Sequence, residues 1–479
     1  MSIDSGLRRL ALRTLLAAFP GPAAPGWSLR LLSDGLAGQT LFASNITKPV
    51  QLSSLTAELR SVRPDVLVAI DEEAGDVTRL AAATGSPYPG NTALGAIDDT
   101  RLTHDIYQSV GTDLTTVGVN LNLAPTADVN TTTHNPAIGT RAFSADPHLT
   151  ARHTAAAVRG LQSTGVAACA KHFPGHGSTT ADSHTSLPTI AADRATLATR
   201  DLPPFRAAIE AGTQAVMTAH IRIPSLTGDA PATFSPAILQ ILLRQELAFQ
   251  GAIITDALEM AAAVLAAGSV GAAAVRALTA GADLLCLGAR VSPELIDHVL
   301  EEIAQAVADG TLPTARLEDA ATRTAALANW ANRPPLPAPH NPTIGLEAAR
   351  QAIHIEGDTT RLANATVIQL DAPHSIAEGN VPWGLAPLAH HRLLFVAPPS
   401  EIDPSWAPED RPVIVAGRRI HQSPEARSLI ETLIKTHRVA VVEMGWPSPW
   451  RPQGASAFIT THGASQANSQ AAAEALGLR

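Results

Sequence analysis

Residues 166–188 read VAACAKHFPGHGSTTADSHTSLP, a short apolar segment followed by a polar stretch rich in histidine. The apolar residues Val166 to Ala170 predict a buried strand. A proline and two glycines in PGHG (174–177) prevent a helix, so the residues from Lys171 onward are predicted to form a loop at the carboxyl end of that strand. A buried strand that leads into a polar loop is the repeating unit of parallel α/β folds.

The same alternation recurs along the first two-thirds of the chain. Apolar segments rich in β-branched residues predict strands, and segments between them, such as 203–211 and 235–247, predict helices. Seven such strands within about 330 residues predict a (β/α)8-type TIM barrel rather than a doubly wound sheet. An eighth strand is not identified, and residues 10–19 are expected to form an amphipathic helix. The predicted strands are 40–43, 66–70, 120–123, 166–170, 215–218, 252–255 and 284–287.

Polar residues stand at the carboxyl ends of five of these strands. The carboxyl ends of parallel strands meet at one face of a barrel, and in barrel enzymes that face carries the active site. Core packing explains one such residue more easily than polar groups at five consecutive strand ends, so we expect these side chains to gather at one site. They are Asp71, Asn122, Lys171 with His172, His220 and Asp256.

A proline-rich segment divides the chain. Residues 332–342 read NRPPLPAPHNP, which predicts an extended, stiff connector. Beyond it the alternation restarts, with strands predicted at 366–370, 393–397, 413–416, 439–442 and 457–460 and helices at 424–436 and 465–476. We therefore predict a TIM-barrel catalytic domain over residues 1–331, a linker over 332–345 and a smaller sandwich-like α/β domain over 346–479.

Composition narrows the possible partners. The chain has 34 Lys and Arg against 43 Asp and Glu, a formal charge of −9, which disfavours nucleic acid and anionic membranes. Cys169 and Cys286 each lie inside an apolar run, which predicts buried thiols rather than a disulfide or metal ligands. Because Arg13 interrupts the apolar segment near the start and no uncharged apolar run of about 18 residues occurs, we expect a cytoplasmic protein without a membrane segment.

Two chemistries are possible for the loop in 171–188. His172, His176 and His184 suggest a metal site, but the Pro-Gly pair between the first two breaks the helix that would aim both imidazoles at one ion, so no metal is expected. Asp182 and His184, two residues apart, predict a carboxylate–imidazole hydrogen bond that leaves the other ring nitrogen for proton transfer. Acid–base catalysis is favoured, and a metal-dependent barrel hydrolase is the alternative from another class.

KHFPGHG followed by DSH resembles the signature of family-3 glycoside hydrolases of the β-N-acetylglucosaminidase type. The resemblance implies a TIM barrel that cleaves a glycosidic bond with retention of configuration, without a metal or an organic cofactor. It extends from about residue 35 to about residue 290, where further segments agree with the family in the same order. They are DEEAGDVTR (71–79), NLNLAPTADVN (120–130), NPAIGTRAF (135–143), VMTAH (216–220), PATFSP (231–236) and ITDALEM (254–260).

The resemblance also implies roles for individual residues. Asp256 matches the nucleophile that forms a covalent glycosyl-enzyme, His184 matches the general acid/base, and Asp182 matches the partner of that histidine. Five further residues match those that hold the hydroxyl groups of the sugar being cleaved. They are Asp71, Arg79, Arg141, Lys171 and His172.

These residue types suit the implied chemistry. Asp256 is the only carboxylate in an otherwise apolar strand end, although it could instead cap a following helix. His184 must carry a proton when the glycosyl-enzyme forms and lose it when that intermediate breaks down. Ionised Asp182 and Asp256 both favour the imidazolium, and esterification of Asp256 removes one of these charges. Because a neutral base repels anions less than a carboxylate does, phosphate as well as water could be the acceptor.

The chain departs from the family after Asp71, where Ala74 and Asp76 replace a glycine and an arginine. This reversed charge could change which aglycone is accepted. We expect a retaining exo-β-N-acetylhexosaminidase that removes terminal N-acetylglucosamine from peptidoglycan fragments, as in peptidoglycan recycling, or from related glycosides. A small carbohydrate is then the expected partner, and the oligomeric state is left open. A β-glucosidase or an N-acetylglucosaminide phosphorylase of the same family is the alternative.

Overall fold

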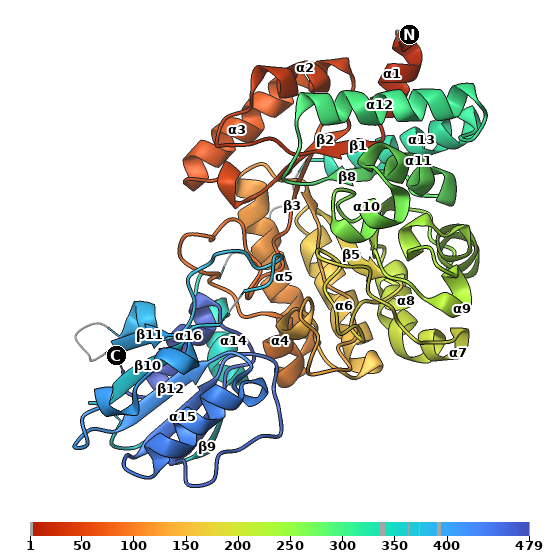
Figure 1. Cartoon of the computed structure of the whole chain (residues 1–479). Coiled ribbons are helices and arrows are strands. Elements are labelled where there is room, and N and C mark those ends of the chain that lie inside the picture. The colour runs from red at the N-terminus through yellow and green to blue at the C-terminus, as the bar shows by residue number, and fades with distance from the viewer. Residues whose placement is uncertain (1–2, 335–340, 363, 373, 390–393, 479) are drawn as a thin grey trace. The chain divides into compact units, whose positions relative to one another are not determined.

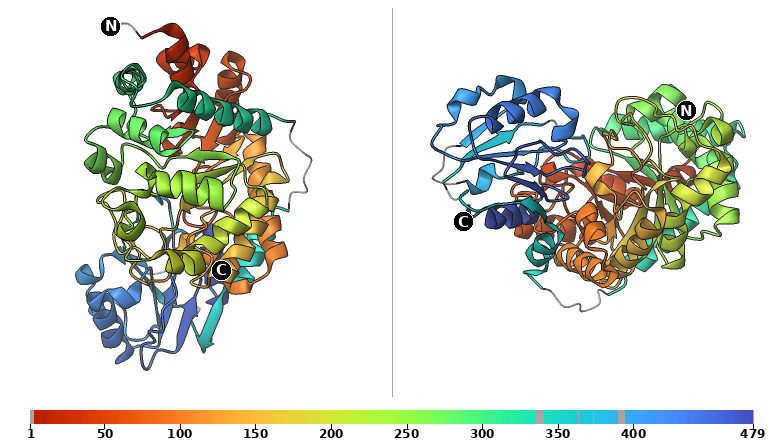
Figure 2. Two further views of the ribbon diagram at one scale, coloured as in Figure 1. Left: turned by 90° about the vertical axis from the view of Figure 1, so that its right-hand side faces the viewer. Right: turned by 90° about the horizontal axis from the view of Figure 1, so that it is seen from below.

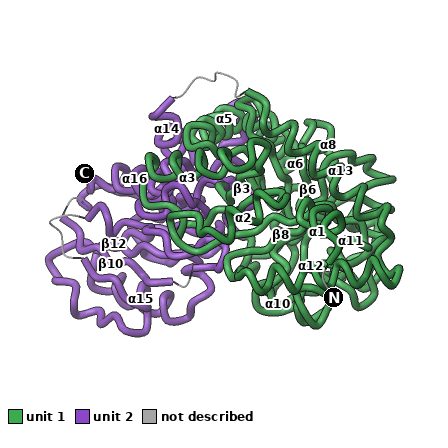
Figure 3. Tube along the Cα trace, turned by 90° about the horizontal axis from the view of Figure 1, so that it is seen from above, with its two compact units in different colours: residues 1–72, 103–138, 145–340 green, residues 73–102, 139–144, 341–479 purple. Residues whose placement is uncertain are grey.

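The structure, a computed structural model, describes residues 3–334, 341–362, 364–372, 374–389 and 394–478. Its contacts divide the chain into two compact units, coloured separately in Figure 3. The first unit holds residues 1–72, 103–138 and 145–340, and the second holds 73–102, 139–144 and 341–479. The domains predicted from the sequence are consecutive segments of the chain, whereas each of these units is built from segments that alternate along the chain. The predicted linker includes residues 335–340, which lie outside the described residues.

The first unit is an eight-stranded parallel barrel, as predicted from the sequence. The strand order is β7-β6-β5-β4-β3-β2-β1-β8, and Leu284 N donates to Ile253 O to join the two ends of the sheet. Helices lie around the outside of the strands (Figures 1 and 2). The strands are β1 (Leu15–Ala17), β2 (Gly38–Leu41), β3 (Leu67–Ile70), β4 (Leu121–Asn122), β5 (Ala167–Phe173), β6 (Ala215–Thr218), β7 (Ala252–Ile254) and β8 (Leu285–Leu287).

Strand β1 is the strand that the sequence pattern leaves unidentified, and the expected helix over residues 10–19 is wrong. Helix α1 (Ser5–Leu12) ends early, and β1 then pairs with both β2 and β8. All three residues of β1 are buried. Because a short, fully buried strand has no polar–apolar alternation, its sequence cannot be told from that of a buried helix.

Residues two apart on the strands fill the interior of the barrel. The buried cluster is completed by Leu327, Ala328 and Ala331 from α13 (Thr314–Ala331). Both cysteines belong to it and are free and buried, which confirms the prediction for the thiols. The same alternation decides where side chains just beyond the strands point. The inward-facing strand residues include Leu16, Leu67, Ala69, Leu121, Ala167, Cys169, Ala215, Met217, Ala252, Ile254 and Cys286.

The helices of the first unit vary in geometry. The predicted helix over 235–247 is η5 (Ala237–Glu246), in which Leu247 N reaches back five residues to Leu242 O, the spacing of a π-helix. Among the described residues, no single helix has the length and hydropathy of a membrane span, although the bent pair α10 and α11 meets both criteria together. The other helices are α2 (Gly26–Asp34), α3 (Pro49–Val62), α5 (Thr100–Thr116), α6 (Pro147–Gln162), α7 (Arg194–Thr196), η3 (Leu197–Asp201), α8 (Leu202–Glu210), α9 (Pro224–Thr227), α10 (Ala261–Ala267), α11 (Val270–Ala280) and α12 (Pro293–Ala308).

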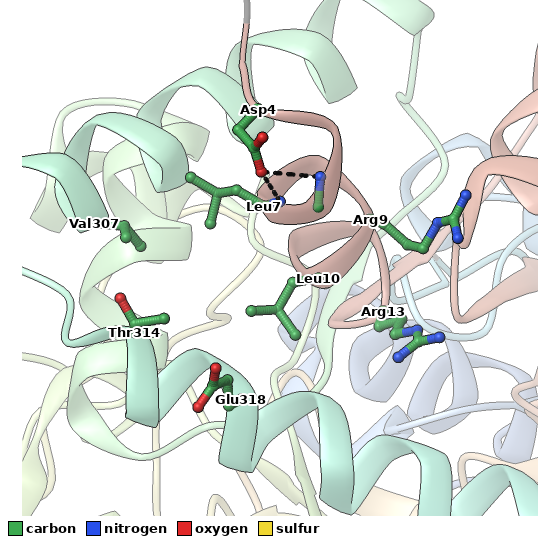
Figure 4. Close-up of a pocket in the computed structure, with 9 residues that line it drawn as sticks. Asp4, Leu7, Arg9, Leu10, Arg13, Val307, Thr314 and Glu318 are labelled. Carbon is green, nitrogen blue, oxygen red and sulfur yellow. Dashed lines mark hydrogen bonds between the residues drawn. The ribbon is translucent and has the colours of Figure 1, made fainter.

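A hollow of about 480 Å³ lies between α1, α12 and α13 (Figure 4). Its lining includes Arg9, Arg13, Asp4 and Glu318. Arg13 stands two residues before β1, so the hollow is at the amino-terminal end of that strand. It therefore lies at the opposite end of the barrel from the polar residues that follow the strands.

The second unit contains a six-stranded sheet in the order β11-β10-β12-β13-β14-β9, parallel except for β9 (His354–Gly357). Val413 and Val415 pack with α15, whereas Ile414 and Ala416 pack with α16. Cover on both faces explains why successive residues of this strand, β12 (Val413–Gly417), are apolar. The exposed, mostly polar β9 was not predicted. The other elements are β10 (Thr366–Leu370), β11 (Leu394–Ala397), β12 (Val413–Gly417), β13 (Val439–Glu443), β14 (Ala457–Thr460), α4 (Asn91–Ile97), α14 (Ile344–Ala352), α15 (Pro424–Ile434) and α16 (Gln466–Ala475).

His462, just after β14, gives the second unit a pH-dependent stability. Burial, together with the charge of His354, lowers the pKa of His462 to about 4. Between this value and the ordinary pKa near 6.5 the unfolded chain binds more protons, so the free energy of unfolding falls as the pH drops through that range, by up to about 3 kcal/mol. His462→Asn, which tolerates the left-handed φ of 58°, is expected to flatten this dependence.

Urea unfolding of wild type and variant at pH 7, 5.5 and 4.5 measures the effect. The matched control is His374→Asn, because His374 is exposed. If the free energy of unfolding falls equally with pH in the wild type and in the His462 variant, His462 is not responsible for the pH dependence.

Candidate active site

Three ionisable side chains point into the barrel at the carboxyl ends of its strands. Asp71, Lys171 and Asp256 each lie two residues beyond a strand residue of the inward-facing cluster, so they share its direction. Burial raises the pKa of the Cys169 thiol, and the charges of Lys171, Asp71 and Asp256 all act on it. These three groups from β3, β5 and β7 therefore surround one point above the barrel core.

Lys171 and Asp71 form an ion pair. Lys171 Nζ donates to Asp71 Oδ1 at 2.6 Å, and the side chains are 2% and 19% exposed respectively. The buried ammonium is thus neutralised by the carboxylate. Asp71 is the member of the pair that a ligand in the barrel mouth can reach more easily.

Strand β5 continues to Phe173, so the expectation that the loop begins at Lys171 is wrong and the loop begins at Pro174. A buried carboxylate, Asp128, binds both the end of this strand and the start of the loop. Its Oδ2 pairs with His172 Nδ1 at 2.7 Å, and its Oδ1 accepts the backbone N–H of His176 at 2.6 Å. Asp128 was not predicted as a site residue, although it is the only acidic residue between Asp113 and Asp146. A single acidic residue in the polar segment after a strand was the sequence feature that could have identified Asp128 as a site residue. Asp128 fixes the orientation of the His172 ring.

His176 supports the loop from inside. Burial lowers its pKa to about 4, so the ring is neutral near pH 7. Its Nδ1 lies 2.8 Å from Thr179 Oγ1 and its Nε2 lies 3.1 Å from Ser183 Oγ. The ring thus connects the first turn of the loop to the residue between Asp182 and His184. In the part of the chain that the structure describes, no group of three or more His, Cys, Asp or Glu is arranged to hold a metal ion.

Asp182 and His184 form the hydrogen-bonded pair predicted from their spacing. His184 Nδ1 lies 2.7 Å from Asp182 Oδ1, and the same oxygen accepts the backbone N–H of His184 at 2.9 Å. Burial raises the pKa of Asp182, but these two hydrogen bonds and the His184 charge outweigh it and lower the pKa overall. Asp182 is therefore ionised near neutral pH and favours a proton on His184.

Asp256 is influenced by three histidines. Burial raises its pKa, yet the positive potentials of His172, His220 and His184 outweigh burial and lower it below the ordinary value. Its Oδ1 accepts the N–H of Ala257 at 2.8 Å, and α10, the next helix, begins five residues later. Asp256 is thus an ionised carboxylate and does not cap that helix.

Two other strand-end residues bind backbone. Asn122, fully buried, exchanges two hydrogen bonds with the backbone N–H and C=O of Glu72 at 3.0 and 2.8 Å. His220 bonds to Thr233 Oγ1 at 2.8 Å and to Ala257 O at 3.1 Å. Asn122 therefore positions the chain after β3, and His220 positions the residue next to Asp256.

Arg79 and Arg141 belong to the second compact unit. Arg141 forms a buried two-point ion pair with Glu73, with Nε–Oε2 and Nη2–Oε1 distances of 2.9 and 2.7 Å. Arg79 donates from Nη2 to Ala377 O at 2.8 Å. Within this unit both guanidinium groups are therefore partly engaged by the protein.

Of the departures at positions 74 and 76, the structure explains Asp76 but gives no explanation for Ala74. Ala74 adopts a φ of 63°, in the left-handed region that favours glycine. Asp76 is buried, and its carboxylate accepts the N–H of Ala464 at 2.8 Å and the hydroxyl of Thr140 at 2.7 Å, with Arg418 Nη2 at 3.7 Å. Asp76 therefore connects parts of the second unit, rather than presenting an isolated charge.

Asp76→Ala is expected to lower the free energy of unfolding by about 3 kcal/mol, because it leaves a buried N–H and a buried guanidinium with fewer acceptors. Urea unfolding of the purified variant measures this loss. Asp410→Ala, at an exposed aspartate of the same unit, is the control and should unfold like the wild type. Equal stability of the two variants would contradict the role given to Asp76.

The model of the glycosyl hydrolase family 3 N-terminal domain matches residues 29–327. The chain belongs to glycosyl hydrolase family 3. The family and the enzyme class predicted from the sequence, a glycoside hydrolase, are thereby confirmed.

Relatives of this family-3 chain include β-hexosaminidases. Beta-hexosaminidase A of Pseudoalteromonas piscicida is 38% identical over 249 residues, which cover 47% of this chain and only 41% of that protein. Beta-hexosaminidase of Stenotrophomonas maltophilia (strain K279a) is 38% identical over 281 residues, 57% of this chain and 81% of that protein. The solved family-3 β-N-acetylglucosaminidase of Paenibacillus sp. FPU-7 matches with a TM-score of 0.88 and 29% identity, over 98% of this chain and 96% of that one.

Proposed function

We propose that the chain is a retaining exo-β-N-acetylhexosaminidase that removes terminal β-linked N-acetylglucosamine through a glycosyl-Asp256 intermediate. The observation that carries the proposal is the Asp182–His184 pair, with its 2.7 Å contact, in a family-3 barrel that also holds an ionised Asp256. An ionised nucleophile and a histidine inclined to carry a proton are the two groups that the first chemical step requires.

In the first step the Asp256 carboxylate attacks the anomeric carbon while the glycosidic bond breaks. His184 gives the proton on Nε2 to the departing oxygen, since its Nδ1 is held by Asp182. The products are a glycosyl ester on Asp256 and the free aglycone.

In the second step water attacks the anomeric carbon and the ester bond to Asp256 breaks. His184, now neutral, takes the proton of the water at Nε2. Esterification of Asp256 removes a negative charge near the imidazole, which eases its change from acid to base.

We propose that Asp71, Lys171 and His172 in the barrel hold the sugar. Asp71 supplies carboxylate acceptors for hydroxyl groups, and Lys171 and Asp128 fix the positions of Asp71 and His172 through contacts of 2.6 and 2.7 Å.

Hydrolysis of an aryl β-N-acetylglucosaminide in preference to the matching β-glucoside tests the proposed specificity. We expect kcat/KM to be at least about ten-fold higher for the N-acetylglucosaminide, because one hydrogen bond to the acetamido group that the glucoside lacks contributes up to about 1.5 kcal/mol. Preference for the glucoside would favour the β-glucosidase alternative. Peptidoglycan fragments in the cytoplasm are the proposed natural substrates, and release of N-acetylglucosamine from such fragments tests this.

Phosphate is a second candidate acceptor because the base is an imidazole instead of a carboxylate. A neutral His184 would repel phosphate less than a second carboxylate would. The test is turnover at rising phosphate concentration with detection of N-acetylglucosamine 1-phosphate. We expect free N-acetylglucosamine to dominate, and a sugar phosphate that grows with phosphate concentration would instead identify a phosphorylase.

A further inference from the structure

An ion pair below the loop after β5 has no part in the chemistry proposed above. Asp201 is fully buried, and its carboxylate is bound by the guanidinium of the neighbouring Arg200, with Nη2–Oδ2 at 2.8 Å and Nε–Oδ2 at 3.1 Å. The pair stands at the end of η3, where Leu202 N bonds to Leu197 O with π-helical spacing. Such π-helical turns occur frequently at functional sites.

The loop backbone lies directly against this pair. A Cβ on Gly175 would come within 2.7 Å of Asp201 Cβ, and a Cβ on Gly177 would come within 2.0 Å of Val129 O on the other side. Only glycine fits at both positions. The first turn of the loop is therefore enclosed between Asp201 and residues 129–130.

Side-chain hydrogen bonds, together with the backbone between neighbouring residues, connect the pair to the catalytic dyad. Arg200 Nη2 donates to Ser178 Oγ at 3.1 Å. The next residue, Thr179, contacts Nδ1 of His176, whose Nε2 contacts Ser183 Oγ at 3.1 Å. Ser183 lies between Asp182 and His184. A displacement of Arg200 would thus be transmitted to the proton-transferring pair through contacts within this loop.

We propose that Arg200 and Asp201 are positioning residues that hold the loop 174–184 so that the Asp182–His184 pair can deliver its proton to the departing oxygen. Neither residue touches the reacting atoms. Asp201 supports the loop backbone and fixes the Arg200 guanidinium, and Arg200 holds Ser178. The part of the proposal that concerns proton delivery rests on the proposed function, whereas the role of the pair in holding the loop does not.

Leaving-group dependence separates a positioning role from a purely structural one. Arg200→Met is compared with the wild type on phenyl and 2,4-dinitrophenyl β-N-acetylglucosaminide, because only the phenolate of the first needs protonation in order to leave. We expect kcat/KM to fall at least ten-fold on the phenyl glycoside and less than two-fold on the dinitrophenyl glycoside. Arg200→Lys, which keeps a donor and the charge, should recover part of the loss.

The matched control is Arg8→Met, which breaks an exposed pair with Asp297 at 3.1 Å on the outside of the barrel. Arg8→Met should leave kcat/KM unchanged on both the phenyl and the dinitrophenyl glycoside. An equal fractional loss on both glycosides in the Arg200 variant, as expected if less protein were folded, would overturn the proposal. So would unchanged rates on both.

Hydrogen–deuterium exchange gives a second measurement that needs no substrate. Peptides covering residues 172–188 are expected to exchange at least several-fold faster in Arg200→Met than in the wild type, with no change in Arg8→Met. Unchanged exchange would overturn the proposal even if the protein cleaves neither glycoside. Failure of the wild type to cleave either glycoside would instead contradict the proposed function, so the two failures are distinguishable.

Discussion

Replacing Asp256 with alanine is expected to reduce kcat on an aryl β-N-acetylglucosaminide by at least about 10³-fold, a loss of roughly 4 kcal/mol of transition-state stabilisation. The carboxylate is the proposed nucleophile, and the pKa lowering by His172, His220 and His184 keeps it ionised. Without it there is no covalent intermediate, and water would have to attack the sugar directly. Steady-state kinetics with p-nitrophenyl β-N-acetylglucosaminide measures the loss.

Rescue of the Asp256 variant by azide gives a more specific test of the nucleophile. The small anion can enter the space left by the Asp256 side chain and attack the anomeric carbon while the aglycone departs. The expected product is a glycosyl azide of the α configuration, with turnover restored in proportion to azide concentration. Asp34→Ala, at an exposed aspartate, serves as the control and should retain full activity. Undiminished turnover by the Asp256 variant without azide would exclude the covalent role of Asp256.

Replacing His184 with alanine has the second largest expected effect, and it depends on the leaving group. General acid catalysis typically contributes 10²–10⁴-fold, so kcat/KM should fall by about that much on phenyl β-N-acetylglucosaminide. On the dinitrophenyl glycoside, whose phenolate leaves without a proton, the loss should be small. Asp182→Asn should show a weaker form of the same pattern, because the histidine remains but loses the carboxylate that favours its protonated form.

The pH profile of kcat/KM provides an independent check on His184. The wild type should lose activity at alkaline pH as His184 loses its proton, and this limb should disappear in His184→Ala. His148→Ala, at an exposed histidine of the same unit, should leave the profile unchanged. A profile that keeps its alkaline limb in the His184 variant would assign the acid to another group.

The sequence predicted the barrel because most of its strands are distinct apolar segments between clear helical patterns. It missed β1, whose three buried residues carry no alternation, and β9, an exposed edge strand. Spacing was sufficient to predict the Asp182–His184 hydrogen bond, whereas the catalytic roles of Asp256 and of this pair were inferred from the family resemblance. Residue types and spacing were insufficient for Asp128, whose partners His172 and His176 lie 44 and 48 residues away.

The second unit was harder to predict because its contacts join distant parts of the chain. Nothing near Asp76 in the sequence indicates that its carboxylate binds the N–H of Ala464, 388 residues away. Likewise, the pairing of Arg141 with Glu73 spans 68 residues. Motif comparison could flag positions 74 and 76 as unusual, but only the three-dimensional contacts explain why an aspartate is accommodated at position 76.

The interleaving of the two units has a consequence for synthesis on the ribosome. Residues 73–102 leave the barrel between β3 and β4, yet many of their partners belong to residues 341–479. At about 5–20 residues per second, Asp76 emerges roughly 20–80 s before Ala464. Until then residues 73–102 lack their native contacts with residues 341–479, so this part of the fold can be completed only after that later segment has been synthesised.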